Sequence, residues 1–133
     1  MRSFALLTSG CRSVSSEVLE PTLRSAHFCT ERHVKHPRQL DLQVAESMRA
    51  AGLDAAAAES GRCREAPAYR VTYLDNWSWD MRLYLAKMTI EVLDRRDRIL
   101  AYGEAAQDSL GALGTSHRDV IDRAVGALLE GSE

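Results

Sequence analysis

The sequence lacks a long hydrophobic run and lacks a strong excess of charge of either sign. No stretch approaches the roughly 18 apolar residues that a membrane-spanning helix needs, so we expect any membrane attachment to come from a lipid. The chain has 17 Lys and Arg against 19 Asp and Glu, a formal net charge of −2. This balance gives no reason to expect nucleic acid or an anionic membrane surface as a partner.

Motifs for catalysis and for nucleotide binding are also missing. No serine is accompanied by a histidine and an orienting acid in a recognisable pattern. The segment Gly111-Ala112-Leu113-Gly114 has neither the spacing nor the lysine of a phosphate-binding loop. The sequence therefore predicts a protein that is not an enzyme and that carries no cofactor.

Near the N-terminus, a short apolar run ends in small residues and a cysteine: Leu6-Leu7-Thr8-Ser9-Gly10-Cys11. Bacterial lipoprotein signals end in this way, and they usually contain an apolar region of roughly 7–15 residues. Here the apolar region is only Phe4-Ala5-Leu6-Leu7. Either the true start lies upstream of Met1, or this is an ordinary N-terminus with a chance cysteine. We take residues 1–10 as a short, truncated signal and Cys11 as the lipidated residue.

The residue after the lipidated cysteine indicates which membrane is reached. Aspartate at that place is the usual signal for retention in the inner membrane of enteric bacteria, and this chain has Arg12 there. We therefore expect an outer-membrane location facing the periplasm. If Met1 is the true start and the signal does not function, the protein is cytoplasmic.

Setting Cys11 aside leaves two cysteines, Cys29 and Cys63. An even number is what an exported protein is expected to keep, because a free thiol is a liability in an oxidising compartment. A disulfide between them would close a loop of about 34 residues and stabilise the fold by about 3–4 kcal/mol. In a cytosolic protein the same two residues would be reduced cysteines.

Three histidines lie close to these cysteines in the sequence. Histidine and thiolate ligate zinc, but this spacing matches no standard zinc finger, and an oxidised Cys29 could not ligate. We predict no metal site, and zinc remains an alternative for a reduced protein only. The possible zinc ligands considered are His27, Cys29, His33, His36 and Cys63.

The polar, serine-rich composition of residues 11–24 predicts a tether. Hydrophobic periodicity then predicts one α+β domain over residues 25–131. Its sheet is expected to be mainly antiparallel, with two helices on one face, in the order β-α-β-β-β-β-α. A bulge is expected at Gly103, and Ser116 with Asp119 predicts the start of the last helix. The expected elements are strands at 25–31, 53–58, 69–73, 83–92 and 99–105, helices at 37–51, with Pro37 in the first turn, and from 116, and a charged turn at 94–98.

The most unusual local block is Asp75-Asn76-Trp77-Ser78-Trp79-Asp80. We interpret Trp77 and Trp79 as anchors of the sheet against a helix, with Asp75 and Asp80 holding a chain reversal. Together with Tyr84, the block is a candidate structural or interaction surface. As an alternative, its two carboxylates beside aromatic rings could act as acid and base or hold a sugar.

In their order and spacing, several short segments of the sequence resemble those of a group of small uncharacterised proteobacterial lipoproteins. They are Cys29-Thr30-Glu31-Arg32, Cys63, Tyr69-Arg70-Val71-Thr72-Tyr73, Trp79-Asp80 and Tyr84-Leu85. The resemblance covers about residues 27–130. It departs at His33, where the group usually has asparagine, and in the shorter signal before Cys11. The resemblance implies an envelope lipoprotein and supplies no catalytic residues.

Together these features predict a non-enzymatic cell-envelope lipoprotein that acts as an interaction or assembly accessory. Its expected partners are the membrane, through the lipid anchor, and another envelope protein. Two alternatives remain. One is a small ligand-binding or enzymatic module that uses the block between Asp75 and Asp80. The other is a soluble cytoplasmic domain, if no export occurs.

Overall fold

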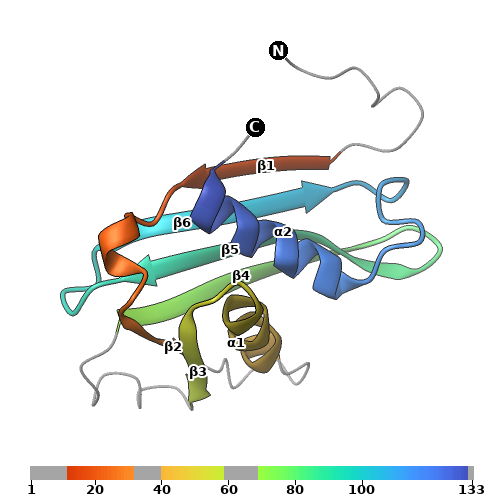
Figure 1. The fold of residues 1–133 in the computed structure, drawn as a ribbon. Coiled ribbons are helices and arrows are strands. Elements are labelled where there is room, and N and C mark those ends of the chain that lie inside the picture. The colour runs from red at the N-terminus through yellow and green to blue at the C-terminus, as the bar shows by residue number, and fades with distance from the viewer. Residues whose placement is uncertain (1–11, 32–39, 59–68, 132–133) are drawn as a thin grey trace.

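A computed structural model describes residues 12–31, 40–58 and 69–131, which form a six-stranded mixed sheet with two helices on one face (Figure 1). The strand order is β1-β6-β5-β4-β2-β3. Pairing is antiparallel from β1 to β4 and parallel from β4 through β2 to β3. The predicted single α+β domain is confirmed. The elements are β1 (Arg12–Glu17), the 3-10 helix η2 (Pro21–Leu23), β2 (His27–Glu31), α1 (Leu40–Ala50), β3 (Asp54–Ala58), β4 (Tyr69–Trp79), β5 (Leu83–Leu93), β6 (Ile99–Gln107) and α2 (His117–Glu130).

The predicted tether over residues 11–24 is wrong for its described part, because Arg12–Glu17 forms strand β1 along the edge of β6. The segment is too polar to show a strand pattern, since only Val14 packs against the core. The strand is held by its backbone pairing with β6 and not by burial of its own side chains. Beyond the strand, Leu19 is fully buried, and its N–H donates to the carbonyl of Leu128 at 2.8 Å. The domain therefore includes residues 12–24.

Both helices bury the stripes that their periodicity predicts. In α1 the buried apolar side chains include Leu40, Val44 and Met48. Gly52 follows with a φ of 97°, a left-handed conformation that glycine adopts at helix ends. In α2 the capping box is confirmed: Ser116 Oγ accepts from the Asp119 N–H at 3.3 Å. The carboxylate of Asp119 in turn accepts from the Ser116 N–H at 2.9 Å.

The bulge of the sheet does not lie where it was expected. Asn76 pairs with Lys87 and Trp77 pairs with Leu85, so Ala86 is an extra residue and this bulge lies in β5. As a result the side chain buried near the start of β5 is Leu85, and Ala86 is half-buried. A second register shift lies between Val92 and Leu93, where β5 pairs with β6. Gly103 sits in regular register in β6, where it pairs with Ser16 and Ile90.

Neither described helix is long and apolar enough to cross a membrane.

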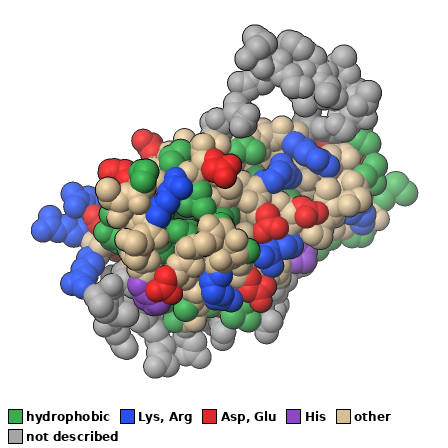
Figure 2. Space-filling view, in the orientation of Figure 1, with side chains coloured by type: hydrophobic (Ala, Val, Ile, Leu, Met, Phe, Trp, Pro, Cys, Tyr) green, Lys and Arg blue, Asp and Glu red, His purple; other side chains and the backbone are tan. Residues whose placement is uncertain are grey.

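The predicted charged turn is confirmed as the connection between β5 and β6, where the Asp94 N–H donates to the carbonyl of Arg98 at 3.0 Å. Basic side chains project at this end of the molecule, to the left in Figure 2.

Candidate functional site

The candidate block lies on the β4–β5 hairpin. Strand β4 continues through the block to Trp79, because Trp77 pairs with Leu85 and Trp79 with Leu83. The chain reverses only at residues 80–82, where the Asp80 N–H donates to the carbonyl of Arg82 at 3.0 Å. The prediction that Asp75 helps to hold the reversal is therefore wrong, since Asp75 lies inside the strand.

Trp77 acts as the predicted anchor between the sheet and a helix. Its indole Nε1 donates to Asp75 Oδ2 at 2.7 Å. Its ring meets the ring of His117, the first residue of α2, edge-on at a centroid distance of 5.8 Å. Trp77 thus joins the hairpin to the start of α2.

The prediction that Trp79 is a second anchor is wrong, because its side chain is 72% exposed. The next residue along the turn, Met81, is 92% exposed and has a φ of 63°. The side chain of Asp80 is also exposed and makes no hydrogen bond within the described chain. The tip of the hairpin therefore presents its side chains to the surroundings.

The two carboxylates of the block do not form an acid–base pair. Asp75 and Asp80 are five residues apart along an extended chain, which rises about 3.3 Å per residue. This rise places their Cα atoms about 16 Å apart, more than the roughly 6.5–9.5 Å between the carboxyl groups of inverting glycosidases. Moreover, Asp75 already accepts the indole hydrogen bond of Trp77.

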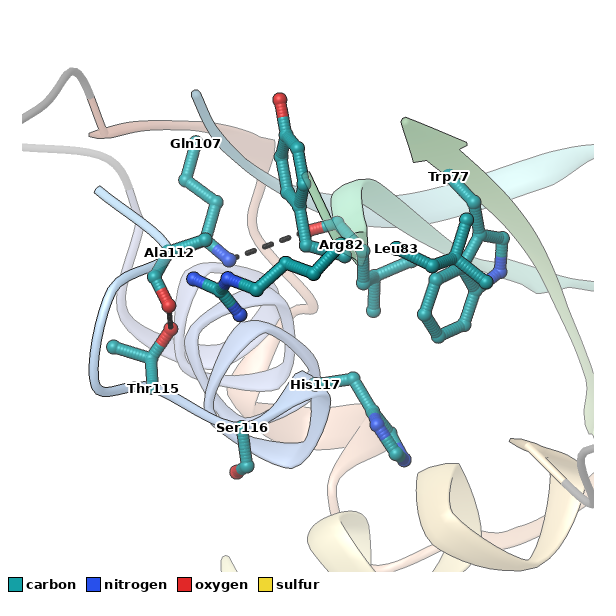
Figure 3. A pocket seen from close by; sticks show the side chains of 10 residues that line it. Trp77, Arg82, Leu83, Gln107, Ala112, Thr115, Ser116 and His117 are labelled. Atoms are coloured by element: carbon teal, nitrogen blue, oxygen red, sulfur yellow. Dashed lines mark hydrogen bonds between the residues drawn. The ribbon is translucent and has the colours of Figure 1, made fainter. Parts of the chain in front are cut away.

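A cavity of about 180 Å³ opens between this hairpin and the start of α2 (Figure 3). Arg82 reaches across it from the turn, and Trp77 and His117 lie together on one side. The guanidinium of Arg82 forms neither a hydrogen bond nor an ion pair with any described residue. The lining residues are Trp77, Arg82, Leu83, Tyr84, Leu85, Gln107, Ala112, Thr115, Ser116 and His117.

Gln107 forms the polar floor of the cavity. Its Nε2 donates to the carbonyl of Leu85 at 3.2 Å, and its Oε1 accepts from Arg123 Nη2 at 3.0 Å. Burial lowers the pKa of the Arg123 guanidinium, and the nearby positive charge of Arg12 lowers that pKa further. The carboxylate of Asp119 acts in the opposite direction and raises that pKa.

Several predicted site residues lie outside the described part of the chain: Cys11, His33, His36 and Cys63. The proposed disulfide and the zinc alternative therefore stay predictions. Cys29 lies in β2 with 8% of its surface exposed, opposite Arg70 and Ala56 on the neighbouring strands. His27 Nδ1 lies 3.0 Å from Asp54 Oδ2. No cluster of possible metal ligands occurs among the described residues.

Sequence reasoning missed the cavity residues Arg82, Gln107 and His117. They come from the turn after β4, the end of β6 and the start of α2, so no local motif links them. The capping box marked the start of α2, but only the sheet register brings that helix end to the hairpin.

No family model and no curated protein matches the chain. Solved structures of similar fold include two PelC dodecamers from Paraburkholderia phytofirmans. One, a variant, is 12% identical, covers 88% of this chain and 98% of its own, and has a TM-score of 0.64. The other is 13% identical, covers 89% and 97%, and has a TM-score of 0.62. At such identities the likeness shows a shared fold alone.

Proposed function

We propose that this chain is a bacterial cell-envelope lipoprotein, anchored through Cys11 at the periplasmic side of the outer membrane. In this proposal it acts without catalysis, as an interaction or assembly component. The observation that carries it is the short apolar run that ends at Ser9-Gly10-Cys11.

The partner class that we propose is another copy of the same chain. The two similar solved structures are both dodecamers. The described surface also exposes Val18, Leu42 and Leu74, and exposed apolar side chains often mark sites of association. Self-association would fit a protein that has an interaction role.

Mass spectrometry of the protein purified from its native membrane tests the anchor. We expect a mature chain that begins at Cys11 and carries several acyl chains, because a single chain anchors only marginally. An intact chain with an unmodified Cys11 would overturn the proposed lipoprotein. Light scattering of the detergent-solubilised protein tests the assembly, and a strictly monomeric mass at all concentrations would overturn self-association.

A second candidate function is the binding of a small carboxylate, and the cavity at Arg82 favours it. A guanidinium can hold a carboxylate through two parallel hydrogen bonds, and the Trp77 ring offers an apolar wall. Calorimetric titration with glucuronate as the probe and glucose as the uncharged control tests this candidate. We expect binding of glucuronate alone, and we expect Arg82→Gln to abolish it. Equal heats for both sugars would exclude the candidate.

A further inference from the structure

One end of the sheet gathers the features that a membrane contact would need. A row of residues crosses the sheet there: Arg12 pairs with Gln107, Gln107 donates to the Leu85 carbonyl, and Leu85 pairs with Trp77. Beyond this row the β4–β5 hairpin continues to its turn, a further ~10 Å at the rise of an extended strand. The 108–115 loop leaves β6 at the same end, and Arg12 Nη2 donates to the carbonyl of Gly111 in that loop at 2.8 Å.

The exposed apolar side chains are concentrated at this end. We call five of them the tip surface: three on the hairpin, with exposures of 72%, 92% and 45%, and two on the 108–115 loop, with exposures of 56% and 60%. In Figure 2 hydrophobic side chains project at the right-hand end, where Figure 1 places the hairpin. The members of the tip surface are Trp79, Met81, Leu83, Leu110 and Leu113.

The opposite end of the sheet has a different character. There the β5–β6 turn, Asp94-Arg95-Arg96-Asp97-Arg98, exposes three arginines. Five exposed large apolar side chains thus lie at one end of the strands, and the other end has Ile99 beside its charged turn.

The first described residue, Arg12, lies at the apolar end, and in the sequence it directly follows the proposed lipid-bearing Cys11. Arg12 is the first residue of β1 and contacts the 108–115 loop. An acyl chain on Cys11 would therefore hold this end, and not the charged end, against the bilayer.

We propose that the tip surface contacts the membrane, with Trp79 and Met81 lying in the interfacial region of the same leaflet that holds the lipid on Cys11. This inference rests on the proposed lipoprotein function. Tryptophan is favoured at membrane interfaces because its ring is amphipathic. The charges of Arg12 and Arg82 offset those of Asp80 and Asp108 around the tip, so a zwitterionic lipid surface suffices.

The test uses the full chain with Cys11→Ser, Trp77→Phe and an N-terminal histidine tag, so that Trp79 is the single tryptophan. The tag tethers the protein to phosphatidylcholine vesicles that contain a nickel-chelating lipid and brominated acyl chains. Anchoring at the N-terminus is then independent of natural lipidation. We expect quenching and a blue shift of Trp79 emission, because interfacial segments lie ~5–10 Å into the headgroup and acyl boundary.

A matched control moves the reporter to the charged end, in a chain that carries Trp77→Phe, Trp79→Phe and Ile99→Trp. This reporter is expected to stay unquenched. If Trp79 is quenched no more than the tryptophan at position 99, the proposed contact is wrong. A blue shift of Trp79 that grows with protein concentration in the absence of vesicles would also overturn it, because a second copy would then cover the tip.

Two substitutions by glutamate measure how much the exposed apolar side chains contribute to vesicle binding when the protein is not tethered. Met81→Glu should weaken sedimentation with phosphatidylcholine vesicles that lack the nickel-chelating lipid by about tenfold, as expected for the loss of one buried apolar side chain. Leu74→Glu, at an exposed apolar side chain of β4 away from the tip, should leave it unchanged. Equal effects of the two substitutions would contradict the proposal. The mass of native Cys11 decides the lipoprotein function separately from these results.

Discussion

At the scale of single residues, the missing side chain of Gly103 sets how closely α2 approaches the sheet. A Cβ atom at this position would lie 2.6 Å from the backbone nitrogen of Leu128 and still closer to the carbonyl oxygen of Ala124. Both atoms belong to the helix backbone, so no side-chain rotation can relieve the overlap. The glycine is needed for close approach, and the sequence alone had suggested a bulge.

We predict that Gly103→Ala destabilises the protein by about 3 kcal/mol, the upper end of the usual cost of overpacking. Equilibrium unfolding in urea measures the change. Gly126→Ala is the control, because a Cβ there meets no atom within 4 Å. In the middle of α2 that substitution should stabilise the helix by up to ~1 kcal/mol. Equal effects of the two substitutions would show that α2 does not pack on β6 in this way.

Also at the residue scale, the sequence of the candidate block did not predict which of its side chains are buried. The sequence drew attention to the block that contains Trp77 and Trp79, but the two tryptophans differ in how they pack. Trp77 precedes the end of the sheet and meets α2, whereas Trp79 lies beyond the point that α2 covers. The bulge at Ala86, opposite Asn76 and Trp77, decides which side chains turn inward, and no residue type in the block signals it.

At the scale of elements, the sequence predicts those whose own side chains form a buried stripe. Helix α2 and strand β5 are of this kind. Strand β1 is not, because its polar residues form a strand only when β6 offers its edge. The parallel pairing of β2 between β3 and β4 was likewise hidden, since pairing partners are set by the chain path between elements.

The turn between β5 and β6 predicts a pH dependence of stability. The backbone N–H of Arg98 donates to Asp94 Oδ1 at 3.0 Å, and this hydrogen bond is the main reason that the pKa of Asp94 lies below its ordinary value of 3.8. The N–H of Arg96 also donates to Asp94 Oδ1, at 2.8 Å. Because the folded pKa is depressed, the stabilisation is present above pH 3.8 and is lost as the pH falls through the folded pKa.

We therefore expect Asp94→Asn to lower the free energy of unfolding at neutral pH. The difference from the unchanged protein should shrink as the pH falls below 3.8. Urea unfolding across this range measures both. Asp80→Asn is the control in the other hairpin turn, since its side chain accepts no hydrogen bond from the described residues. A constant difference between Asp94→Asn and the unchanged protein at all pH values would contradict the prediction.

At the scale of the whole molecule, the chain is divided into two parts by its sheet pairing. Strands β1, β6, β5 and β4 form an antiparallel unit that α2 covers, and β2 and β3 add a parallel flank that α1 covers (Figure 1). Cys29 lies in the parallel flank. The segment from Cys29 to Cys63 contains α1 and β3, so a disulfide between these cysteines would enclose most of that flank.

We predict that Cys29→Ser and Cys63→Ser each lower the free energy of unfolding by about 3–4 kcal/mol, the value expected for closing a loop of about 34 residues. If the two cysteines are paired, the double substitution should cost no more than either single one. Urea unfolding of the three variants in the absence of reductant measures this. Additive losses would show that the cysteines act independently and are not bonded to each other.

Peptide mapping under non-reducing conditions gives a second and more direct measurement. The protein has three cysteines, so the pairing of two of them decides the fate of the third. A Cys29–Cys63 peptide would leave Cys11 for the lipid. A peptide that joins Cys11 to Cys29 or Cys63 would contradict both the predicted disulfide and the lipid anchor at once, because a cysteine in a disulfide has no thiol to acylate.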